Sequence, residues 1–98
     1  MKRKTEIEKS FIETAVTVVN NFNIELANRS TKLIVELNRD DDDGIYISEI
    51  DIYSDDEDYS FFETYIIFIG ERLELTKRQL KVDLKKSISK WLAELRKN

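Results

Sequence analysis

The chain has 98 residues, with 20 acidic and 16 basic side chains and a net charge of −4 at pH 7, and this length suits one domain. It contains no cysteine and no histidine, which excludes a disulfide framework, a thiol nucleophile, a histidine general base and the usual ligands of zinc, haem and iron–sulfur clusters. Any metal that this protein binds would therefore be a hard cation held by oxygen ligands. No cofactor is predicted.

A helix is expected first. The segment Thr5-Glu6-Ile7-Glu8 fits a capping box, in which the threonine hydroxyl and the last glutamate side chain bond to free amides of the first turn. Apolar residues then recur at helical spacings of three and four, at Ile7, Phe11, Ala15, Val18 and Phe22. The pair Asn20 and Asn21 favours an end of this helix near Asn20.

The pattern changes to a two-residue period at Phe22. Residues 22–27 alternate apolar and polar side chains, which predicts a first strand, and residues 33–38 repeat this alternation in a second strand. Arg39 to Gly44 should close a hairpin, because Asp-Gly tolerates the backbone of a tight reversal. A third strand is expected over residues 45–53, with a bulge near Ser48 and Glu49 because its apolar residues change phase there.

The segment Phe61 to Gly70 is apolar on both faces when it is interpreted as a strand. Such a run of β-branched and aromatic residues predicts a fourth strand inside a sheet, with other parts of the protein packed on both of its faces. One face would carry Phe61, Tyr65, Ile67 and Ile69, and the other Phe62, Ile66 and Phe68.

A second capping box, Thr76 to Gln79, predicts the start of the last helix. Its apolar stripe comprises Leu80, Leu84, Ile88, Trp91, Leu92 and Leu95. The predicted fold class is therefore α+β, with the order α-β-β-β-β-α. The expected architecture is a four-stranded antiparallel meander in chain order, with the N- and C-terminal helices packed on one face.

Charge is distributed unevenly along the chain. Residues 36–63 contain twelve acidic residues and one basic residue, Arg39, for a local net charge of −11. Residues 76–98 contain eight basic and two acidic residues, for a local net charge of +6. The basic helix could contact nucleic acid, or it could be the ordinary solvated side of an amphipathic helix. Because the acidic segment would repel phosphates, no direct nucleic-acid binding is predicted.

The run Asp40-Asp41-Asp42-Asp43-Gly44 suggests a calcium loop, but the register argues against it. With Gly44 at loop position six, Arg39 would occupy position one and Ile50 position twelve, so two main ligands would be missing. The acidic turns are also expected to be exposed, where nothing would raise a carboxyl pKa towards neutrality. No metal site, catalytic residue or enzymatic activity is predicted.

The acidic residues instead suggest a protein-binding ridge. Two acidic loops would lie at opposite ends of the third strand, about 30 Å apart at 3.3 Å per residue. The candidate residues for a basic protein partner are Asp40, Asp41, Asp42, Asp43, Glu49, Asp51, Asp55, Asp56, Glu57 and Asp58. A ridge of this kind could imitate a phosphate backbone.

The segment Thr31 to Asn38, the acidic turn with Gly44, and Tyr46-Ile47-Ser48-Glu49 resemble the central hairpin of small acidic anti-CRISPR proteins from phages of Gram-positive bacteria. This resemblance covers about twenty residues. It implies an inhibitor that mimics DNA and occupies the basic DNA-recognition groove of an RNA-guided nuclease in the host cytoplasm.

An alternative function uses the apolar residues of the second sheet face. Ile34, Tyr46, Phe62, Ile66 and Phe68 would leave that face more apolar than a solvated sheet. A homodimer that buries this face, in a small structural or assembly protein, is the expectation under this hypothesis. No apolar run reaches the roughly 18 residues of a membrane span, so a soluble cytoplasmic protein without a membrane partner is expected.

Overall fold

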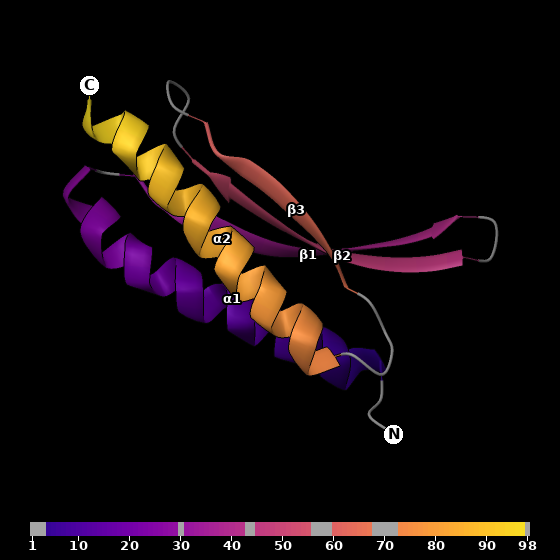
Figure 1. The fold of residues 1–98 in the computed structure, drawn as a ribbon. Helices are drawn as coiled ribbons and strands as arrows, with labels where there is room; N and C mark the ends of the chain where they lie inside the picture. Colours follow the sequence, from indigo (N-terminus) through magenta and orange to yellow (C-terminus); the bar gives the residue numbers. More distant parts are fainter. Residues whose placement is uncertain (1–3, 30, 43–44, 56–59, 68–72, 98) are drawn as a thin grey trace.

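The computed structural model describes residues 4–29, 31–42, 45–55, 60–67 and 73–97. Its elements in chain order are α1 (Lys4–Leu26), the 3-10 turn η1 (Ala27–Arg29), β1 (Leu33–Asp42), β2 (Ile45–Ser54), β3 (Phe62–Ile67) and α2 (Leu73–Arg96). The strands form an antiparallel sheet in the order β1-β2-β3, and both helices cover one face of it (Figure 1). The α+β class is confirmed, but across these described ranges the sheet has three strands, and the prediction of four was wrong.

The predicted first strand, residues 22–27, is the last part of α1 and the start of η1. Phe22, Ile24 and Leu26 alternate as in a strand, but Val18, Phe22 and Leu26 also follow the four-residue spacing of a helix. Leu26 is fully buried, whereas Ile24 is 77% exposed. These two residues lie about 200° apart around a helix, so opposite environments are what a helix produces. The helical stripe continued from the N-terminal half therefore decides the structure.

Both helices also begin upstream of their predicted caps. Thr5 lies inside the first turn of α1, and Thr76 lies inside the first turn of α2, which starts at Leu73. The carboxylate of Glu8 binds side chains of the sheet, where the capping box predicted a bond to the Thr5 amide. The two capping-box motifs therefore lie near the N-terminal ends of these helices but do not give their first residues.

The predicted bulge near Ser48 and Glu49 is absent, because both ladders keep an unbroken register through these residues. The change of phase has another cause. Ile50 and Ile52 are buried under the helices, whereas Ile47 is 41% exposed on the other face. Ser48 takes the core-facing position between them, and its hydroxyl donates a hydrogen bond of 2.5 Å to Glu8 Oε2. A buried polar contact therefore interrupts the apolar alternation without inserting a residue.

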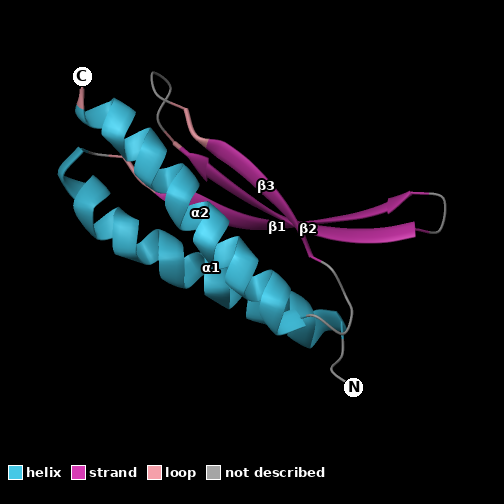
Figure 2. Cartoon of the chain, viewed as in Figure 1, coloured by secondary structure: helices cyan, strands magenta, loops and turns pink. Residues whose placement is uncertain are grey.

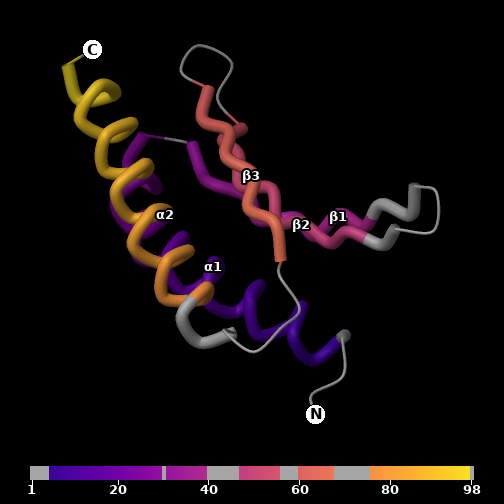
Figure 3. The backbone as a smooth tube through the Cα atoms, turned by 45° about the vertical axis from the view of Figure 1, so that its right-hand side comes forward, coloured from indigo at the N-terminus to yellow at the C-terminus, as the bar shows by residue number. Residues whose placement is uncertain are grey.

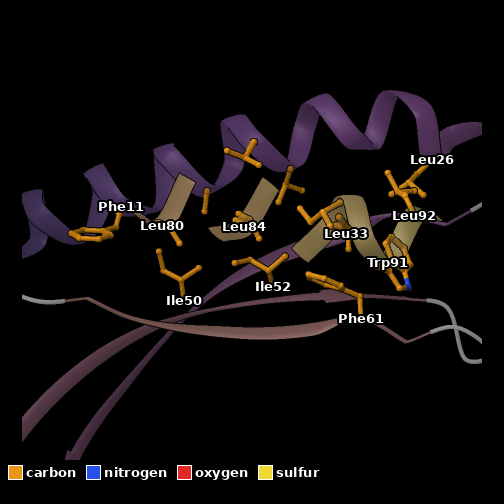
Figure 4. Close-up of a cluster of buried hydrophobic side chains, with 14 of the residues drawn as sticks. Phe11, Leu26, Leu33, Ile50, Ile52, Phe61, Leu80, Leu84, Trp91 and Leu92 are labelled. Carbon is orange, nitrogen blue, oxygen red and sulfur yellow. The ribbon is translucent and has the colours of Figure 1, made fainter. Parts of the chain in front are cut away.

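One hydrophobic core lies between the helices and the sheet (Figure 4). Side chains of both helices pack with those of all three strands, which contribute Leu33, Ile52 and Ile67 among others. Figure 4 shows Phe11 and Leu84 of the helices together with Leu33, Ile52 and Phe61, the residue that precedes β3. The Phe61 and Trp91 rings lie 5.5 Å apart between centroids and are tilted by 51°, a geometry that favours aromatic pairs. The expected core face of the last strand is confirmed for buried Phe61 and Ile67 and half-buried Tyr65, and Ile69 lies outside the described residues. The expectation that both faces of this strand are covered was wrong, because Phe62 and Ile66 on its other face are exposed.

The two helices run parallel, with their N-terminal ends at the same end of the molecule (Figure 3). Between the two helices the chain runs along the sheet three times in alternating directions. It therefore returns to the end of the molecule where α1 starts, and α2 starts there too. Contacts at the other end join them: Arg29 Nη1 donates to the Leu95 carbonyl oxygen at 3.3 Å, and Arg96 forms an ion pair with Glu25.

The far part of the β1–β2 hairpin extends beyond the helices (Figure 2). The pairing of β2 with β3 ends at Ser48, whereas the pairing of β1 with β2 continues to Asp42 and Ile45. Residues 40–42 and 45–47 therefore form a two-stranded arm.

Candidate functional site

The sheet face opposite the helices is uncovered by any described residue, and register places its side chains in rows across the strands. One row joins Ile34, Tyr53 and Phe62, the next joins Glu36, Asp51 and Thr64, and the third joins Asn38, Glu49 and Ile66. We call this surface, with Ile47 on the arm side, the open face.

Three carboxylates lie together in the middle of the open face. Glu36 and Asp51 are direct cross-strand neighbours, and Glu49 is two residues from Asp51 on β2. Like charges placed directly opposite one another destabilise a sheet. None of the strand residues whose side chains are described on this face is a lysine or arginine. The fold therefore keeps an acidic cluster that no basic residue of the described open face neutralises.

Asp51 is held in place within this cluster. Its carboxylate accepts hydrogen bonds from Asn38 Nδ2 and from Thr64 Oγ1, the latter at 2.8 Å. Because these donors come from the strands on both sides, Asp51 is oriented in the centre of the sheet. Glu36 is exposed and Glu49 is half-buried.

Apolar side chains surround the acidic cluster. Phe62 is 65% exposed and Ile66 is 50% exposed, on either side of Thr64 in β3. Ile34 and Tyr53 are half-buried and complete the row that contains Phe62. Aromatic residues in an uncovered patch are typical of protein-binding surfaces.

The predicted acidic ridge is only partly within the described structure. Asp40, Asp41 and Asp42 belong to the arm end of β1, but nothing is described of their side chains. Asp43 and residues 56–58 lie outside the described residues. Glu49 and Asp51 do lie on the open face, in the strand between the two predicted acidic ends.

Asp55 has a structural role at the end of the hairpin opposite the arm. Its Oδ1 accepts hydrogen bonds from Thr31 Oγ1 and from the Lys32 amide, both at 2.9 Å. The Lys32 amide bond, followed by the Thr31 hydroxyl bond, lowers the pKa of the Asp55 carboxyl below its ordinary value. This carboxylate therefore fastens the segment before β1 to the end of β2.

A second carboxylate, Glu8 of α1, lies on the helix side of the sheet and is only 2% exposed. Arg39 of β1 donates to both of its oxygens, from Nε and Nη2 at 3.0 Å each, and Ser48 of β2 donates from its hydroxyl. Since Arg39 and Ser48 are paired across β1 and β2, this polar cluster fixes α1 on the hairpin. We assign it a structural role because its buried carboxylate is already bonded to three donor atoms.

Most of the described basic side chains belong to the helices, whereas Lys32 and Arg39 lie just before and within β1. The exposed ones on α2 are Arg78, Lys81, Lys85, Lys86, Lys90 and Arg96. A groove of about 400 Å³ between the N-terminal halves of the helices is lined by Lys77, Arg78 and Lys81 together with Glu13 and three hydroxyl side chains of α1. The charge asymmetry along the sequence thus becomes an asymmetry between two sides of the molecule.

The predicted oligomer face is also partly brought together. Ile34 and Phe62 share one row, and Ile66 lies two rows away. Nothing is described of the side chain of Tyr46, and Phe68 lies outside the described residues. The candidate residues named from the sequence did not include Glu36 or Tyr53, although both belong to this face. The signal was the polar–apolar alternation of the two strands, but only their register shows that these residues adjoin Asp51 and Phe62.

Comparison with protein-family models, curated proteins and solved structures gives no match. Among the residues that the structure describes, no group of three or more acidic side chains is arranged to hold a metal ion. Neither helix, over its described length, is long and apolar enough to span a membrane.

Proposed function

We propose that this protein is a non-enzymatic binding module whose open face docks on a basic surface of another protein. The observation that carries this proposal is the cluster of Glu36, Glu49 and Asp51 in the centre of that face, framed by exposed apolar side chains. A partner with lysine or arginine beside apolar residues would complement both parts of the surface. Complementary charge accelerates the encounter, and desolvated apolar contact slows dissociation.

The finer form of the proposal is an inhibitor that occupies the nucleic-acid site of a basic protein, such as an RNA-guided nuclease. It is supported by the line of carboxylates along β2 and by the placement of Asp42 and Asp55 at opposite ends of the hairpin. A nucleic-acid site presents basic side chains at intervals along a groove. In this function duplex DNA and the protein compete for the same surface.

The alternative, a homo-oligomeric assembly protein that buries the open face, is favoured by the exposure of Phe62 and Ile66. Charge argues against it. Face-to-face packing of two copies would bring both sets of Glu36, Glu49 and Asp51 between sheets about 10 Å apart, with no basic residue from the described part of either face. A heterologous basic partner avoids this cost.

Stopped-flow association with a panel of purified basic nucleic-acid-binding proteins, including a guide-loaded nuclease, tests the proposal. The test variant carries Glu36→Gln and Glu49→Gln, which leave the bonds of Asp51 intact. We expect association to slow roughly three- to ten-fold at low salt and the difference to shrink as the Debye length falls to about 8 Å near 0.15 M salt. Duplex DNA should compete with binding.

The matched control replaces Lys81, Lys85 and Lys86 by glutamine, so that the helix layer loses charge while the open face is unchanged. This control should bind as fast as the parent or slightly faster. A rate that is independent of salt, or equal rates for the parent and the Glu36/Glu49 variant, would contradict the proposal.

A further inference from the structure

The outer edge of β3 has no strand beside it among the described residues, and it carries few of the features that usually protect edge strands. The sheet order leaves β1 and β3 at the two edges. β1 carries Glu36, Arg39 and three aspartates, whereas β3 contains one charged residue, Glu63, with no lysine and no proline. Its pairing with β2 also runs without a bulge. Edges without these features are templates for a further strand.

The direction of the backbone groups at this edge follows from the ladder. The Ser54 amide donates to the Phe61 carbonyl oxygen at 3.0 Å, which makes this pair a hydrogen-bonded one. Since bonded residues alternate along an antiparallel strand, Glu63, Tyr65 and Ile67 also bond to β2. The amides and carbonyls of Phe62, Thr64 and Ile66 therefore point away from the sheet, and the same three residues carry their side chains on the open face.

The side chains along this edge are self-complementary about Thr64. When two β3 strands pair antiparallel with Thr64 opposite Thr64 of a second copy, Phe62 of each lies opposite Ile66 of the other. All three outward-pointing residues then meet outward-pointing residues, and each pair exchanges two backbone hydrogen bonds. Aromatic–β-branched and Thr–Thr pairs are favourable across strands. A shift by two residues in one direction would place Glu63 opposite Glu63, and a shift by two in the other would leave Phe62 beyond the paired segment.

There is room beside the edge on the helix side. A groove of about 310 Å³ opens there, with Thr64, Tyr65 and Ile66 of β3 on one wall and Gln79, Leu80 and Asp83 of α2 among the residues opposite. In the antiparallel register the partner's core-side residues at positions 63 and 65 face this groove.

We infer that the edge of β3 pairs with β3 of a second copy to form a two-fold symmetric dimer with one continuous six-stranded sheet. Two-fold contacts of this isologous kind are the commonest in homo-oligomers. This dimer differs from the face-to-face dimer expected from the sequence, because it keeps both acidic clusters exposed on one side. It does not depend on the proposed function.

Single cysteines test the register, since the chain has no natural cysteine. In the proposed dimer Thr64→Cys places two thiols across the symmetry axis, with Cα atoms about 5.5 Å apart, inside the 4.4–6.8 Å range of disulfides. Phe62→Cys alone places its thiols about four residues apart along the strands, roughly 13 Å. Thr64→Cys should therefore cross-link with itself on mild oxidation, whereas Phe62→Cys and Ile66→Cys should cross-link only when the two variants are mixed.

Lys85→Cys, on the exposed surface of α2, is the control for random collision. At about 10 µM protein, an effective thiol concentration near 1 mM in the dimer makes Thr64→Cys react about a hundred-fold faster than this control. If Thr64→Cys fails to fold, the mixture of the other two edge variants tests the same register. Cross-linking no faster than the control, or Phe62→Cys alone reacting as fast as Thr64→Cys, overturns the inference. So does a parent protein that sediments as a monomer throughout the micromolar range, which would leave the edge to a strand of another protein.

Discussion

Replacing Arg39 by alanine should destabilise the fold through Glu8, which would remain buried after losing two of its hydrogen bonds. The carboxylate is 2% exposed and the Arg39 side chain 49% exposed. Breaking a fully buried ion pair costs about 3–5 kcal/mol. Because half of the guanidinium side chain is in contact with solvent, screening reduces this cost, and we expect a loss of about 2–3 kcal/mol in the free energy of unfolding.

Urea unfolding followed by the fluorescence of the single tryptophan, Trp91, measures this loss. With a dependence on urea of about 1–3 kcal/mol per molar, the midpoint should fall by about 1–2 M. Lys9→Ala, on the exposed surface of the same helix, is the matched control and should change stability by no more than about 0.5 kcal/mol. Replacing both Glu8 and Arg39 by methionine should recover most of the loss, because no unpaired charge then stays buried. The reasoning fails if the free energy of unfolding of Arg39→Ala lies within about 0.5 kcal/mol of the parent. It also fails if the double variant loses as much stability as the sum of the losses of the two single variants, at Glu8 and at Arg39.

Three further predictions concern stability. Asp55→Asn should lower the stability of the fold at neutral pH but not in acid. The folded-state pKa of the Asp55 carboxyl lies below the ordinary value of 3.8. The stability that this carboxylate contributes is therefore present above pH 3.8 and is lost as pH falls through the folded-state pKa. Urea midpoints at several pH values should therefore converge for parent and variant at low pH, and a constant difference would contradict the hydrogen-bond explanation. Leu84→Ala, at a fully buried position, should lower the free energy of unfolding in urea by about 3–5 kcal/mol. Val82→Ala, two residues earlier on the exposed side of α2, should lower it by less than about 0.5 kcal/mol. Equal losses for the two variants would contradict the burial of Leu84 in the core. Asn23→Ala should lower the free energy of unfolding by about 1–3 kcal/mol, because the Asn23 side-chain amide both donates to the Leu33 carbonyl at 3.1 Å and accepts from the Leu33 amide at 2.8 Å. In this variant hydrogen exchange of the backbone amide should accelerate more at Leu33 than at Ile50.

Apolar periodicity predicted most of the core. The stripe of the last helix is buried at all six predicted positions, and the two-residue period of the hairpin placed Leu33 and Leu37 on the side of the helices. The period failed at residues 22–27, because the three apolar residues there satisfied both a strand and a helix. The helical stripe that already linked Ile7 to Phe22 continues to Leu26, and this continuity over the whole of α1 decides the structure.

The candidate site was less predictable because it depends on the alignment between strands. The sequence shows that residues 36–63 are acidic, but it does not show that Glu36 lies beside Asp51 or that Asn38 and Thr64 orient Asp51. The role of Glu8 was hidden for a similar reason. Its partners are 31 and 40 residues away in the chain. From the sequence alone, a glutamate three residues after a threonine is typical of a capping box.

The parallel arrangement of α1 and α2 has a consequence for the order of folding. The pairing of β1 with β2 joins residues that are close in the chain, whereas the contacts that join the C-terminal ends of the helices close segments of 66 and 71 residues. Closing a long segment costs more chain entropy than closing a hairpin, and non-local contacts slow folding. The hairpin should therefore form early and α2 should dock last, so that truncation of the C-terminal turn speeds unfolding while leaving the rate of folding nearly unchanged.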